Sequence, residues 1–203
     1  IMSKTDSLEK LHHPCQTWNC HCPLTFRHIS PTTLRPYEVQ IDKYKCGPVA
    51  IINALHYCGR DAGPALRRSL LTTCQTVPEH NDGFKGTKPD RLDIAISHIL
   101  SSSAGRFIGR SDCIRAIRNN KFKAYIILYS GFRKNKEQYF HYIFTYKSSI
   151  NTTSSYLDTT PIFISQNDGS HLETRLHLTD LIAEYFNVED THPISYPQVW
   201  AII

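Results

Sequence analysis

The stretch Gln40–Gly59, QIDKYKCGPVAIINALHYCG, predicts a buried helix that begins directly after a cysteine. Gly47 and Pro48 suit a first turn, because the N–H group that proline lacks would have no partner there. The residues that follow are almost all apolar, so we expect the helix over 47–57 to be buried on most sides. Serine or aspartate would cap such a helix more effectively. Cys46 is therefore either an ordinary buried thiol or a residue that the helix holds in position.

The size and composition of the chain are those of a globular protein. Its 203 residues suffice for one domain with a sizeable core. With 40% hydrophobic and 20% charged residues, it is too apolar for a disordered chain. The net charge is +5, but the basic residues are scattered and no long basic run interleaves with aromatics. The charge pattern therefore gives no argument for a nucleic-acid partner, and does not exclude one.

Several absences in the sequence bear on the compartment. No stretch of about 18 apolar residues is present, so we expect no transmembrane helix. The first residues contain no apolar signal-peptide core. The seven cysteines are an odd number, which without a signal peptide is typical of free thiols in a reducing compartment. We therefore expect the protein in the cytoplasm, or delivered into a host cell.

We divide the chain into an N-terminal tail or arm over residues 1–35 and one domain over residues 36–203. The tail shows no periodicity and contains a cluster formed by His12, His13, Cys15, Cys20, His21 and Cys22. Zinc is usually held by two ligand pairs some distance apart, whereas these residues are crowded together. We therefore predict no metal or other cofactor and interpret the tail as a flexible, oxidisable arm. A zinc-binding or nucleic-acid-binding tail is the alternative.

Apolar spacing and turn signals predict further helices, and then strands. Helices are expected at 64–73, after Thr87, which we take as an N-cap, after Ser111 and after Thr179. Short β-branched and aromatic segments predict strands at 105–109, 123–130, 138–147, 154–159 and 197–203. Helices that precede most of the strands are typical of an α+β domain with an antiparallel sheet, rather than a doubly wound one.

A set of residues in this pattern suits nucleophilic catalysis by a thiol. Such catalysis needs a site that favours the thiolate, a base, and donors for the oxyanion formed on attack. Cys46 meets the first need, since a helix N-terminus carries partial positive charge. Of the eleven histidines, His141 alone stands inside a β-rich segment with apolar or aromatic neighbours on both sides. Asp158 follows after a turn, and a hairpin of that length would bring it beside His141 to orient the ring.

These motifs resemble those of the papain-like cysteine peptidases. The stretch around Cys46, with HYIFTY from His141 and LDTTP around Asp158, is most similar to the bacteriocin-leader (double-glycine) peptidases. In that fold a glutamine six positions before the nucleophile donates to the oxyanion hole, and Gln40 stands six before Cys46. The resemblance covers residues 37 to about 162 and the final strand. It implies a papain-like fold in which a central buried helix bears the cysteine and packs against an antiparallel β-sheet.

The resemblance implies a cysteine hydrolase that cleaves a peptide or isopeptide bond through a thioester. Its site would consist of Cys46, His141, Asp158 and Gln40, and its partner would be a protein or peptide substrate. A glutamine deamidase or an acyltransferase would use the same thioester, so both remain alternatives. A third alternative is a non-catalytic papain-like module that binds a peptide in the same groove, with Cys46 an inert buried thiol.

Overall fold

The computed structural model describes residues 44–100, 105–132, 138–148, 162–166, 173–186 and 197–202. In chain order these form α1 (Cys46–Tyr57), α2 (Pro64–Cys74), α3 (Pro89–Ile99), β1 (Gly105–Ile108), α4 (Arg110–Arg118), β2 (Ala124–Phe132), β3 (Gln138–Ser148), β4 (Ile162–Gln166), β5 (Glu173–Leu176), α5 (Leu178–Tyr185) and β6 (Gln198–Ile202). The strands form a sheet in the order β1-β6-β2-β3-β4-β5, and each neighbouring pair is antiparallel. The prediction of an α+β chain with an antiparallel sheet is confirmed.

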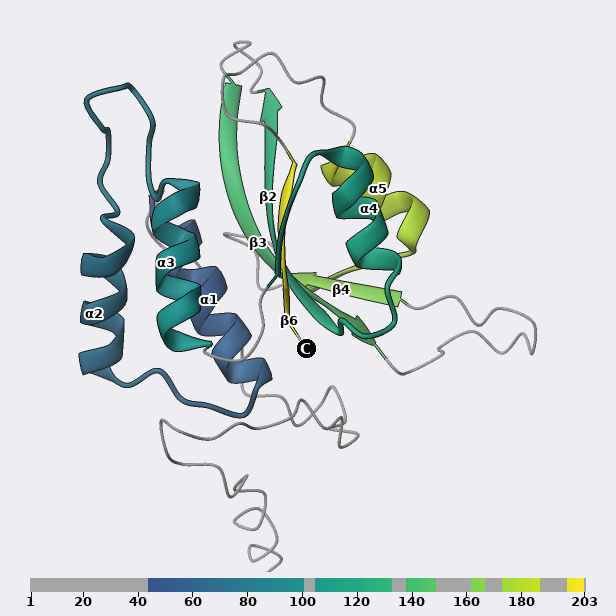
Figure 1. Cartoon of the computed structure of the whole chain (residues 1–203), viewed down its shortest axis with the longest axis horizontal. Coiled ribbons are helices and arrows are strands. Elements are labelled where there is room, and N and C mark those ends of the chain that lie inside the picture. Colours follow the sequence, from purple (N-terminus) through teal and green to yellow (C-terminus); the bar gives the residue numbers. More distant parts are fainter. Residues whose placement is uncertain are drawn as a thin grey trace, which may run out of the picture.

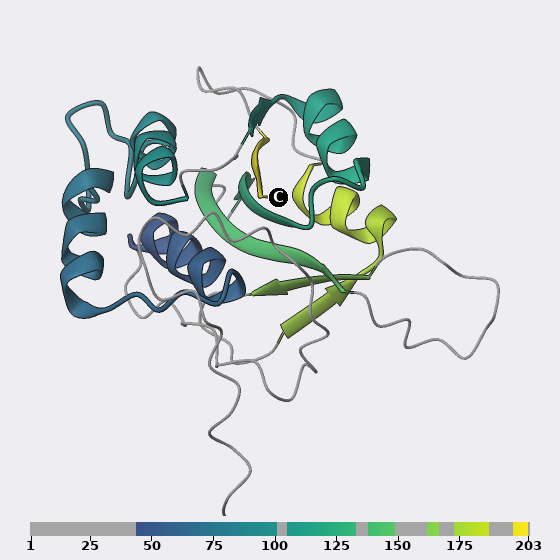
Figure 2. The same cartoon turned by 60° about the horizontal axis from the view of Figure 1, so that its bottom comes forward.

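Helices cover both faces of this sheet. α1, α2 and α3 lie on one side of it and α4 and α5 on the other, as the two views in Figures 1 and 2 agree. α1 packs directly on the sheet, mainly against β3, while α2 packs against α1 and α3. The central strands β2 and β3 therefore lie between two helical layers, in the middle of the molecule.

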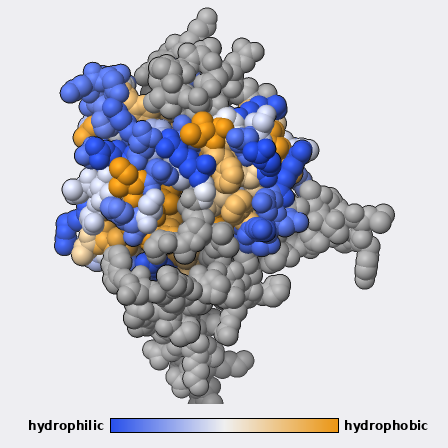
Figure 3. All heavy atoms as spheres, in the orientation of Figure 1, coloured by the Kyte–Doolittle hydropathy of each residue, from blue (hydrophilic) through white to orange (hydrophobic). Residues whose placement is uncertain are grey.

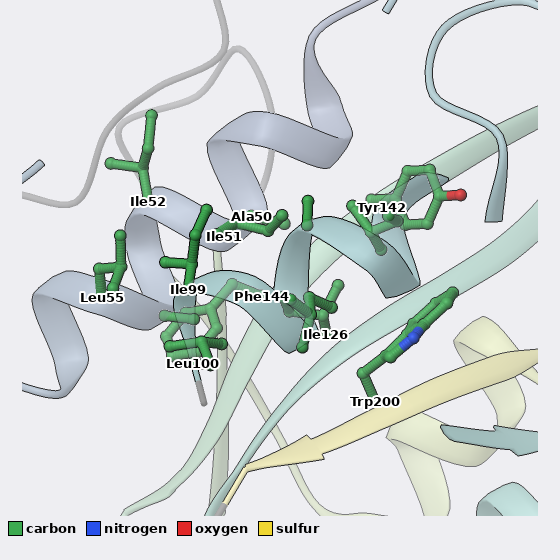
Figure 4. Close-up of a cluster of buried hydrophobic side chains, with 14 of the residues drawn as sticks. Ala50, Ile51, Ile52, Leu55, Ile99, Leu100, Ile126, Tyr142, Phe144 and Trp200 are labelled. Carbon is green, nitrogen blue, oxygen red and sulfur yellow. The ribbon is translucent and has the colours of Figure 1, made fainter. Parts of the chain in front are cut away.

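The alternation of side chains along the strands divides the core into two clusters, because neighbours along a strand point to opposite faces. The face that α1 covers, called here the α1 face, carries Ile126, Tyr142, Phe144 and Trp200 (Figure 4). The opposite face, called here the α5 face, carries Tyr125, Ile127, Ile143 and Val199. α1, α2 and α3 complete the first cluster, and α4 and α5 complete the second.

Most of the predicted elements are confirmed to within a few residues. α1 begins at Cys46 itself, and Gly59 follows its end with a φ of 71°, a conformation that suits glycine after a helix. The prediction of Thr87 as an N-cap is wrong: α3 has Lys88 at its N-cap, with no side-chain cap, and Thr87 is fully buried. β4 and β5 are not predicted from the sequence. The tail and the predicted strand over 154–159 lie outside the described residues.

The surface of the described residues is mixed in character. In Figure 3, hydrophilic residues cover most of the surface on the side of α2 and α3, and hydrophobic residues gather towards the middle of the view. The large hydrophobic side chains that are exposed are Val77, Ile94 and Ile108. No helix within the described ranges is both long and apolar enough to cross a membrane.

Candidate active site

Cys46 is the first residue of α1 and is only 7% exposed. Lys45, at the N-cap, makes no side-chain cap, and the first turn contains no acidic residue. The free N–H groups and partial positive charge of a helix N-terminus favour a negative charge at this point. The predicted place of Cys46, at the start of a buried helix, is confirmed, and its role as a nucleophile stays a prediction.

The other three described cysteines, Cys58, Cys74 and Cys113, are also free thiols. Burial raises the pKa of each to about 12. At neutral pH these three side chains are therefore protonated, and a protonated thiol is a poor nucleophile. They provide an internal reference against which the reactivity of Cys46 can be measured.

Thr87 connects the start of α1 with β3. A Cβ atom on Gly47 would stand 2.8 Å from Thr87 Oγ1 and 2.9 Å from Thr87 Cβ, so the approach requires glycine. The backbone oxygen of Thr87 accepts a hydrogen bond of 3.0 Å from the hydroxyl of Tyr142 on β3. Gly47 directly follows Cys46 in the chain, and Tyr142 directly follows His141. Thr87 therefore contacts the next residue along from each of two predicted catalytic residues.

His141 is the fourth residue of β3, and its side chain lies on the α5 face. Its ring packs against that of Tyr129 with 5.7 Å between the centroids, and the Tyr129 ring lies 4.8 Å from that of Tyr185 on α5. Cys46 belongs to the cluster on the opposite face, together with Tyr142. The register therefore does not place His141 across from Cys46. The two side chains therefore lie on opposite faces of the sheet.

The remaining predicted site residues, Gln40 and Asp158, lie outside the described residues. The structure thus locates two of the four residues of the predicted site. Within the described ranges, no group of three or more His, Cys, Asp or Glu side chains is arranged to hold a metal ion. The His/Cys cluster of the tail lies outside those ranges.

A half-buried histidine that the sequence does not single out lies close to the start of α1. Nε2 of His80 donates a hydrogen bond of 2.8 Å to the carbonyl oxygen of Gly86, which fixes the orientation of the ring. Gly86 in turn packs against the chain that enters α1, because a Cβ atom there would stand 3.0 Å from the carbonyl oxygen of Tyr44. The contact of Gly86 with Tyr44 joins segments that are far apart in the sequence, and no local pattern around His80 indicates it.

The sequence was compared with family models and with curated proteins. No family model matches the sequence, and no match was found among curated proteins.

Proposed function

We propose that the protein is a cysteine hydrolase with a papain-like fold, and that Cys46 is its nucleophile. The observation that carries the proposal is the place of Cys46: it is the first residue of a buried helix that packs on the central strands of an antiparallel sheet. The contacts of Thr87 with Gly47 and Tyr142 support it, because they join the start of α1 to the strand that carries His141. A nucleophile on a rigid, buried support is held in place for attack.

The proposed reaction is an acyl transfer. The thiolate of Cys46 attacks the carbonyl carbon of the substrate, and the oxyanion that forms is stabilised by the Cys46 backbone N–H and by Gln40. His141 takes the proton of the Cys46 thiol and then gives it to the leaving amine, which departs and leaves a thioester on Cys46. His141 then takes a proton from the water that cleaves the thioester, and Asp158 orients its ring. The roles of His141, Asp158 and Gln40 come from the resemblance to papain-like peptidases.

The substrate class follows from the same resemblance: a peptide or isopeptide bond in a protein. A glutamine side chain would give ammonia as the leaving group, and a second amine in place of water would give acyl transfer. The products distinguish the three reactions. Peptide cleavage generates a new α-amino group, deamidation releases ammonia with a mass change of one unit and no cleavage, and acyl transfer joins two molecules.

Thiol reactivity tests the proposal before any substrate is known. The intact chain is treated with iodoacetamide at mildly acidic and neutral pH, and the rate at each cysteine is followed by peptide mapping. We expect Cys46 to react faster than a cysteine in a short peptide at the acidic pH, where few free thiols are ionised. His141→Ala should remove that advantage, and Cys46→Ala should remove the fast-labelled peptide altogether. Cys74, which is fully buried, is the control within the same molecule.

The non-catalytic peptide-binding module is a second candidate, and one observation favours it. His141 is buried and packs against Tyr129, whose ring contacts Tyr185, on the face of the sheet away from α1, where a histidine can serve packing alone. If this candidate is correct, Cys46 will react no faster than a peptide cysteine and His141→Ala will leave its rate unchanged. That pair of results would reject the enzyme.

A further inference from the structure

We propose that Thr87 is a positioning residue that fixes the start of α1 relative to the start of β3, and so fixes Cys46 relative to His141. The inference rests on the proposed function, which it extends to a residue outside the predicted site. Thr87 is fully buried and belongs to neither element. It lies in the short connection between the isolated bridge Val77–Gly86 and α3.

The side chain of Thr87 holds the first turn of α1. Its Oγ1 and Cβ atoms lie so close to the backbone of Gly47 that any side chain there would overlap them. Oγ1 of Thr87 makes a hydrogen bond of 2.7 Å with Oγ1 of Thr76, which lies shortly after the end of α2. The rotation of the Thr87 side chain is therefore fixed, and the turn that begins with Cys46 rests on a group that cannot easily move.

The backbone of Thr87 holds β3. Its carbonyl oxygen accepts the hydrogen bond from the Tyr142 hydroxyl, and this bond is buried. Breaking a buried hydrogen bond leaves an acceptor without water, so the link is costly to lose. Since adjacent residues in a strand lie only about 3.3 Å apart, a constraint on Tyr142 also constrains the backbone of His141. The side chain of Thr87 thus restrains the turn that begins with Cys46, and its carbonyl oxygen restrains the strand that carries His141.

The preceding residue reinforces this contact. Gly86 packs against the carbonyl oxygen of Tyr44, immediately before α1, and its own carbonyl is held by His80. Residues 86 and 87 therefore contact the chain on both sides of Lys45 and Cys46. Relative positions matter most at this point, because a displacement of about 1 Å can slow a catalysed reaction roughly a hundredfold.

Three variants test the role of Thr87. Thr87→Val keeps the shape of the side chain but removes Oγ1, and Thr87→Ser keeps Oγ1 but removes the methyl group. Tyr142→Phe removes the hydroxyl that donates to the Thr87 carbonyl. The matched control is Tyr125→Phe, since Tyr125 is an equally buried sheet tyrosine on the α5 face whose hydroxyl donates to the backbone oxygens of Ile117 and Phe122.

The measurement is the rate of Cys46 alkylation by iodoacetamide as a function of pH, with thermal unfolding measured alongside. We expect Thr87→Val and Tyr142→Phe to lower the rate at mildly acidic pH about tenfold, which is within the range that small misplacements cause. Their rate profiles should move towards that of a free thiol. Thr87→Ser should retain most of the wild-type rate. Tyr125→Phe should lower the unfolding temperature and leave the rate and its pH profile unchanged.

The outcomes separate this inference from the proposed function. If wild-type Cys46 is fast, but Thr87→Val and Tyr142→Phe only lower the unfolding temperature as Tyr125→Phe does, Thr87 has a structural role alone and the inference is wrong. If wild-type Cys46 is no faster than a peptide cysteine, the proposed function fails first and the positioning role fails with it.

Discussion

The two faces of β3 differ sharply in chemistry, although they alternate along one short sequence. Between Phe140 and Lys147, every side chain of the strand on the α1 face is aromatic: Phe140, Tyr142, Phe144 and Tyr146. The α5 face carries His141, Ile143, Thr145 and Lys147, and all four are buried. One strand therefore supports an apolar helix on one side and holds polar and titratable groups out of water on the other.

The two faces of the sheet therefore have different structural requirements. On the α1 face the main requirement is close packing, because α1 has few polar groups to satisfy and must be held rigidly. On the α5 face each buried polar group needs a partner, since burial without one costs free energy. Lys147, for example, donates to the carbonyl oxygen of Asn119 at the end of α4 and lies over the ring of Tyr125. Substitutions on the α1 face should therefore change stability mainly through packing. Substitutions on the α5 face should mainly change how stability depends on pH.

The largest effect is expected on the α1 face, at Trp200. Its ring is fully buried, its Nε1 donates to Asp93 of α3 at 2.8 Å, and Arg106 lies 5.4 Å from its centroid. Trp200→Ala should lower the free energy of unfolding by about 3–5 kcal/mol, because it opens a cavity and frees α3 from the sheet. Urea denaturation measures the change. Trp200→Phe, which keeps most of the ring, is the control and should cost much less; equal losses would mean that the Asp93 bond, not packing, matters at this position.

Much of this fold can be predicted from local pattern. The apolar run after Cys46, the Pro-containing helix starts and the aromatic strands each give their element directly, because helix and strand periodicities differ. Phe140 to Lys147 even shows the alternation that separates the two faces. What the alternation does not tell is which face α1 covers. That depends on packing between segments more than 80 residues apart, such as α1 and β3.

The site was predictable to a lesser extent. The place of Cys46 at a helix start could be predicted from its neighbours, and the helix does begin there. The direction of His141 could not, since a strand residue points to one face or the other according to its register. Threonine is a common residue at helix caps, and only the burial of Thr87 against Gly47 indicates a different role. A single residue that packs on two distant segments leaves no repeated pattern in a sequence.

Buried thiols on the two faces give a second, smaller test. Cys74 lies in the cluster of the α1 face and Cys113 in that of the α5 face, and burial raises the pKa of each to about 12. Above about pH 9 a thiol ionises in the unfolded chain but not in the folded one, so stability is full below pH 9 and is lost as the pH rises towards 12. Each thiol should contribute a slope of roughly −1.4 kcal/mol per pH unit in that window.

Cys74→Ala and Cys113→Ala should therefore each flatten the alkaline decline by the same amount, whatever they cost in packing at neutral pH. The measurement is urea unfolding at a series of pH values from 8 to 11. Equal changes of slope would mean that both faces exclude water equally well. A change for Cys74 alone would indicate that the α5 face admits water, and would contradict the burial of Cys113 seen here.

The smallest effect, and the only one of opposite sign, is expected from Lys147 on the α5 face. Burial, with a contribution from the nearby Lys123, lowers the pKa of Lys147 from 10.5 to about 8. Between these values the unfolded chain binds a proton that the folded chain does not, so this group makes stability rise with pH. Lys147→Met should remove that rise while keeping the apolar stem packed. Lys123→Gln should move the start of the rise to higher pH, because one source of repulsion is gone. If Lys147→Met leaves the dependence between pH 8 and 9 unaltered, the ammonium group is solvated, and the contrast between the two faces of β3 is weaker than its side chains suggest.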